Sequence, residues 1–72
     1  MTIRYAVIVE EGATGFGAYV PDLPGCVAAV DTREDVIHLI QDAIGFHVEG
    51  LKENGKTIPA PVSSVEFVDA AA

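Results

Sequence analysis

The sequence predicts an α+β fold in which three antiparallel strands are followed by one long helix and a last short strand. Apolar residues alternate with other residues near the N-terminus, and they recur every three or four positions after residue 35. Turns rich in glycine and proline separate these segments. Because 72 residues suffice for one domain only, we expect a single domain spanning 1–72, with the helix on one face of the sheet.

Strand signals occupy the first part of the chain. The alternation over 2–10 predicts a first strand, and the glycine-containing segment 11–15 suits a hairpin loop. A second strand is expected over 16–20. The segment 23–26, Leu-Pro-Gly-Cys, matches a type II turn, since proline presets its own φ and glycine accepts a positive φ. The apolar segment 26–30 would complete a three-stranded meander. A last short strand is expected around Val65, Phe67 and Val68.

A helix of about 22 residues, roughly 33 Å long, is predicted after Thr32. The Thr32 hydroxyl suits an N-cap, and Glu34 and Asp35 suit the positive end of the helix dipole. Asn54-Gly55 is a typical stop signal. The helix carries one main apolar stripe, made of Ile37, Ile40, Ile44, Val48 and Leu51.

The apolar surface exceeds what one helix and one sheet face bury. Ala6 and Ile8 lie on the strand face opposite Tyr5, Val7 and Val9. The helix has a second apolar set beside its main stripe, made of Val36, Leu39, Ala43 and Phe46. We expect the surplus to form an interface, and the chain to be a homo-oligomer. The alternative is a wide core contact within a monomer.

Charge and composition exclude several function classes. Four Lys and Arg residues against eleven Asp and Glu residues give a net charge of -7, whereas nucleic acids and anionic membranes both require a basic surface. A basic protein remains a suitable partner. One cysteine and two histidines do not make a dense metal cluster. The N-terminus lacks the pattern of a signal peptide, so we expect a cytoplasmic protein without a metal or cofactor.

A specific string, Tyr-Val-Pro-Asp-Leu-Pro-Gly-Cys, occupies residues 19–26. Together with Asp-Thr-x-Glu-Asp at 31–35 and Asn-Gly-Lys-x-Ile-Pro-x-Pro at 54–61, it resembles the HicB family of antitoxins from prokaryotic toxin–antitoxin pairs. The resemblance runs in the right order from residue 5 to residue 61. It implies a reduced ribonuclease-H-like fold with the element order β-β-β-α-β.

The resemblance also implies a function. Members of this family bind and block HicA, a small basic ribonuclease that cuts messenger RNA, and many add a C-terminal DNA-binding domain. This sequence stops shortly after Pro61, so we expect that domain to be missing, and it has Val30 where the family often has glycine. We therefore predict an antitoxin domain that neutralises a HicA-like toxin by steric contact. The alternative is a stand-alone, self-associating module of the same fold with another ligand.

A residual metal-dependent nuclease is a much weaker hypothesis. Its candidate carboxylates are Glu10, Asp22 and Asp31. Each has an ordinary explanation, as a strand end, a turn former and a helix start respectively. The resembled family also lacks the nuclease acids, so we expect no catalytic residues and no enzymatic activity.

Partner binding requires an apolar centre with an acidic rim. We expect Phe16, Tyr19, Leu23 and Pro24 as candidates for the centre and Asp22 as a candidate for the rim. Phe16 and Tyr19 lie three apart on a strand and point to opposite faces, so at least one of them is expected in the core instead.

Overall fold

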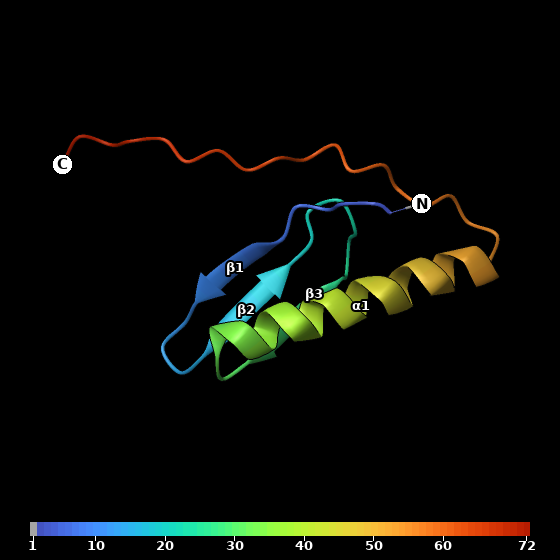
Figure 1. Cartoon of the computed structure of the whole chain (residues 1–72), viewed down its shortest axis with the longest axis horizontal. Coiled ribbons are helices and arrows are strands. Elements are labelled where there is room, and N and C mark those ends of the chain that lie inside the picture. The colour runs from blue at the N-terminus through green and yellow to red at the C-terminus, as the bar shows by residue number, and fades with distance from the viewer. Residues whose placement is uncertain (1) are drawn as a thin grey trace.

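The computed structural model describes residues 2–72 and contains three short strands and one long helix (Figure 1). The strands are β1 (Ile8–Glu11), β2 (Phe16–Tyr19) and β3 (Val27–Val30), and the helix is α1 (Arg33–Glu53). The three strands form an antiparallel sheet in the order β1-β2-β3, so each loop connects two strands that are adjacent in the sheet. The α+β prediction of a meander followed by a long helix is confirmed.

The turn between β2 and β3 has the predicted geometry. The amide of Cys26 donates to the carbonyl of Leu23 at 3.0 Å, and Gly25 has a φ of 85°. Glycine accepts this positive φ without the clash that a Cβ atom would cause. The turn places Leu23 and Cys26 under the sheet, where both are buried.

Both ends of α1 are capped as the sequence indicates. The Thr32 hydroxyl accepts a hydrogen bond from the Asp35 amide at 3.1 Å. At the other end, the Gly55 amide donates to Lys52 and the Lys56 amide donates to Leu51, which is the Schellman pattern. Gly55 adopts a φ of 65°, which suits the residue after the cap.

The core lies between the inner face of the sheet and α1. The helix packs chiefly on β3 and β2 and least on β1. Alternation along β2 turns Ala18 and Val20 inward. Half-buried side chains, including Phe16 and Val30, surround this centre. The buried set consists of Ala18, Val20, Leu23, Cys26, Val36 and Ile40.

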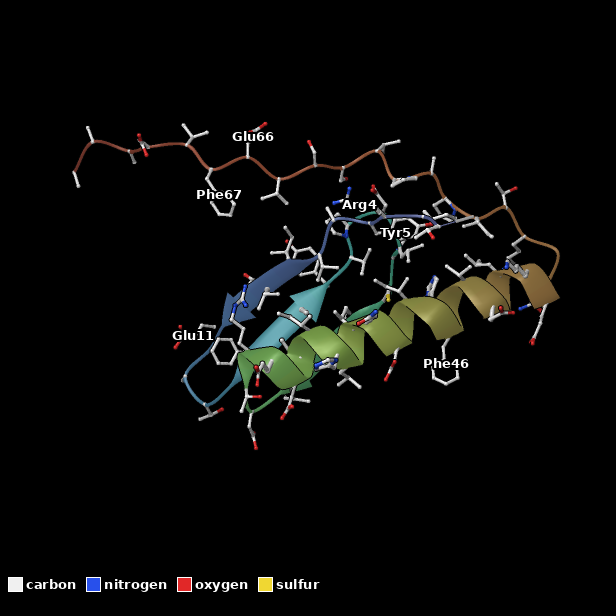
Figure 2. The ribbon with its side chains drawn as sticks, in the orientation of Figure 1. Arg4, Tyr5, Glu11, Phe46, Glu66 and Phe67 are labelled. Carbon is white, nitrogen blue, oxygen red and sulfur yellow. The ribbon has the colours of Figure 1, made fainter. Side chains whose placement is uncertain are left out.

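The buried helix face takes residues from both predicted apolar sets, because Ile40 of the main stripe is buried together with Val36. Val36, from the second apolar set, is fully buried, whereas Ile37, from the main stripe, is 38% exposed. At about 1.5 Å per helical residue and 3.3 Å per strand residue, α1 is more than twice as long as any strand. The sheet therefore covers only part of the helix, and Phe46 points away from it (Figure 2).

Two strand predictions are corrected, the start of the first strand and the existence of the last one. The first strand begins at Ile8 rather than near residue 2, because its partner β2 ends before Pro21, which has no amide proton to donate. The expected last strand is not formed. Phe67 is 95% exposed and Val68 is 86% exposed, and no backbone hydrogen bond within residues 2–72 involves the segment 64–72. A strand needs a neighbour to bond with, and this segment runs apart from β1 (Figure 1).

Truncation of Leu23 tests the position of the core. Leu23→Ala should lower the free energy of unfolding by about 2–5 kcal/mol, because it leaves a cavity under the turn. The matched control is Leu39→Ala on α1, whose leucine is 41% exposed and which should cost less than about 1 kcal/mol. Urea unfolding measures both. Equal losses in the two variants would contradict this core.

Candidate functional site

The face of the sheet that α1 does not cover carries a row of apolar side chains. Ile8 pairs with Tyr19, and Tyr19 pairs with Val27, so the three lie side by side across β1, β2 and β3. Tyr19 is 41% exposed and Val27 is 65% exposed. Because neighbouring Ala18 and Val20 point into the core, Tyr19 points away from it. We call Ile8, Tyr19 and Val27 the outer row.

Acidic side chains border the outer row at one end of the sheet. Glu10 follows Ile8 by two residues within β1, so alternation puts it on the same face as the row, and Asp31 comes directly after β3 at the same end of the sheet. Both are exposed. With Glu11 and the β1–β2 loop they line a hollow of about 540 Å³. An apolar centre with an acidic border is suited to contact with a basic protein surface.

The five residues that the sequence suggested for partner binding lie in different places. Leu23 is fully buried and Phe16 is half-buried against the same core, so Leu23 offers no surface to a partner. Tyr19 lies in the outer row, which agrees with the expectation that only one of the two aromatics is exposed. Pro24 is exposed in the turn between β2 and β3, and Asp22 is half-buried beside it.

The carboxylate of Asp22 is held within the chain. The Ser63 amide donates to Oδ2 at 2.9 Å, and the Ser63 hydroxyl donates to Oδ1 at 2.8 Å. These two hydrogen bonds stabilise the ionised carboxylate and lower the pKa of Asp22, and the opposing effect of burial is smaller. Asp22 therefore fixes the start of the C-terminal segment to the turn after β2.

A second contact ties the segment before β1 to the segment after α1. The Tyr5 hydroxyl donates to the carbonyl of Pro59 at 2.6 Å. Figure 2 shows Arg4 and Tyr5 between the sheet and the C-terminal segment. The Asp-Leu-Pro-Gly turn and the Ile-Pro-x-Pro string thus each contact a segment that is far away in the sequence.

Two residues were not predicted from the sequence: Val27, which lies in the outer row, and Ser63, which binds Asp22. Val27 was recognisable, because it belongs to the predicted apolar third strand and pairs opposite Tyr19 in the expected antiparallel order. Ser63 had no comparable signal, because its partner Asp22 is 41 residues away and follows from the tertiary fold alone.

The remaining chemistry-bearing side chains do not gather. Cys26 is buried, and desolvation raises the pKa of its thiol, which makes it a poor nucleophile. Within residues 2–72, no three His, Cys, Asp or Glu side chains come close enough to hold a metal ion. In the same part of the chain, no helix combines the length and the apolar character needed to cross a membrane.

Comparison with known families decides what kind of protein carries this surface. A family model described as the HicB-like antitoxin of bacterial toxin–antitoxin systems matches residues 5–72. The chain belongs to this HicB-like antitoxin family. The resemblance of the string at 19–26 and of the later motifs is therefore confirmed.

Similar proteins extend this assignment. The chain is 34% identical to Antitoxin HicB 2 of Photorhabdus laumondii over 93% of its length and 49% of that protein. It is 36% identical to an uncharacterized 14.9 kDa protein from the rep-hol intergenic region of Haemophilus phage HP1, over 76% of its length and 41% of that protein. The chain thus spans less than half the length of both relatives. UPF0150 protein Ta0767 of Thermoplasma acidophilum is 33% identical, over 79% of this chain and 84% of that protein.

A solved structure has the same architecture. A chain in a HicA3 and HicB3 toxin–antitoxin complex superposes with a TM-score of 0.70 at 30% identity. The match covers 83% of this chain and 70% of that chain. The antitoxin fold of this HicB-like protein is therefore shared with a protein solved in complex with its partner.

The bond between Asp22 and Ser63 gives a pH-dependent contribution to stability. Because the folded pKa of Asp22 is lowered, this contribution is present above the unfolded pKa and is lost as the pH falls through the folded pKa. Asp22→Asn should therefore be less stable than the parent at neutral pH, and the difference should shrink in acid. Urea midpoints across the acidic range measure it. Asp42→Asn, an exposed change on α1, should show no such convergence.

Proposed function

We propose that this chain binds a small basic ribonuclease of the HicA type and blocks it sterically through the outer row and its acidic border. The observation that carries the proposal is the apolar row of half-buried Ile8 and exposed Tyr19 and Val27, at the same sheet face as Glu10, on a chain of net charge -7. The apolar row supplies desolvated contact area, and the acidic border attracts a surface built to hold RNA phosphates. The HicB-like family and the toxin–antitoxin complex of similar fold support a toxin partner.

Two of the five residues expected from the sequence belong to this proposed surface. Tyr19 provides its central aromatic side chain, and Pro24 provides an exposed contact in the adjoining turn. Asp22 acts indirectly, because it holds Ser63, while Phe16 supports the sheet from the inner face.

The proposed action is contact rather than catalysis. Glu10 and Asp31 are exposed at the sheet end, whereas the Asp22 carboxylate is occupied by Ser63. We place the action in the cytoplasm, where a toxin that cuts messenger RNA would work. We also propose that the chain associates with itself, because exposed apolar side chains remain outside the outer row.

Inhibition of the product of the neighbouring gene, which we expect to be a small basic ribonuclease, tests the proposal. Purified chain should stop RNA cleavage at a fixed stoichiometry, and the complex should weaken as salt is raised, because its charges are opposite. Tyr19→Arg should weaken inhibition about 30-fold, since loss of a central aromatic contact typically costs 2 kcal/mol or more. Titration calorimetry and an RNA cleavage assay measure these effects.

The matched control is Phe46→Arg, which places the same charge on an exposed aromatic of α1, away from the sheet. This variant should inhibit like the parent chain. The proposed surface would be wrong if Phe46→Arg abolished inhibition and Tyr19→Arg did not. The proposed partner would be wrong if the parent chain failed to bind the neighbouring ribonuclease at low salt, which would leave the self-associating module with another ligand.

A further inference from the structure

The C-terminal segment 64–72 has the extended shape of a β-strand but no partner strand in the part of the chain that the structure describes. It is extended, and none of its backbone groups takes part in a backbone hydrogen bond within residues 2–72. Val65 is 45% exposed and Phe67 is 95% exposed. These two side chains are two residues apart, so a strand presents both to one face. The segment therefore has an apolar side that is not packed against the rest of the described chain.

The same chain presents a matching surface along β1. In the described chain β1 pairs with β2 alone, so the backbone groups of its outer edge are free. Because α1 covers β1 least, a groove of about 380 Å³ remains between them. It is lined mainly by apolar side chains, with Arg33 as its basic member. The groove residues are Val7, Val9, Arg33, Ile37, Ile40, Gln41 and Ile44.

We propose that two copies of this chain exchange their C-terminal segments. The segment 64–69 of one copy adds a strand to the β1 edge of the other, and Val65 and Phe67 enter the groove between β1 and α1. This inference rests on the self-association proposed above and names the residues that carry it. In this arrangement the acidic Asp69, which alternation places on the same face as Val65 and Phe67, comes close to Arg33, one of only four Lys and Arg residues in the chain.

A second copy fits this groove for a geometric reason. Asp22 holds Ser63 beside the turn after β2, and from there the segment runs along the β1 side of the sheet without closing on it (Figure 1). Both the strand and the groove therefore stay open in one chain. Each copy supplies one C-terminal segment and one groove, so two copies related by a two-fold axis fill both grooves.

Sedimentation of the chain alone tests the exchange. The parent chain should be a dimer, and Phe67→Asp should raise its dissociation constant at least about tenfold, because a charge would enter an apolar groove. The matched control is Phe46→Asp, whose phenylalanine is 81% exposed on the far side of α1, and it should remain a dimer. Because each copy carries a charge of -7, added salt should strengthen the dimer and weaken the ribonuclease complex.

An isotope-filtered NOE experiment on a mixture of labelled and unlabelled chains identifies the copy that fills the groove. Contacts should appear between the Phe67 ring of one copy and the methyl groups of Val9 and Ile37 of the other. Contacts within one chain only would overturn the exchange. A dimer that survives Phe67→Asp would also overturn it and leave self-association standing, whereas a monomer at all concentrations would remove both.

Discussion

A three-stranded sheet has two faces, and residues 2–72 supply one helix to cover them. The helix α1 lies mainly over β3 and β2, and the resulting core contains six buried side chains. Apolar burial at about 25 cal/mol per Å² is the dominant favourable term in folding, so the chain cannot do without this core. The same geometry leaves the outer row, the β1 edge and the far half of α1 uncovered.

The uncovered surfaces are the basis of the proposed action by contact. The outer row has acidic neighbours in Glu10 and Asp31, which suits a basic partner. The groove beside β1 has an apolar lining and one basic residue, which suits an apolar segment with acidic flanks. The two surfaces lie on opposite faces of β1, since the outer row contains Ile8 and the groove contains Val7 and Val9. The proposed toxin binding and the proposed self-association therefore use different side chains.

Local patterns predicted those parts of the fold that short-range physics determines. The cap at Thr32, the positive φ of Gly25 and the end of pairing before Pro21 each follow from one residue type at one position. The face of α1 that is buried did not follow, because Val36 and Ile37 are equally apolar and only the helix–sheet packing distinguishes them. The site was half predictable: the exposure of Tyr19 followed from alternation, whereas the Asp22–Ser63 bond joins segments 41 residues apart.

The central claim is that the outer face of the sheet is the surface that meets a toxin. Cross-saturation NMR tests it most directly, with labelled chain bound to the unlabelled neighbouring ribonuclease. Saturation of the partner should reduce the signals of Ile8, Tyr19 and Val27 and leave those around Phe46 on α1 unchanged. Signal loss centred on Phe46, with the outer row unaffected, would contradict the account.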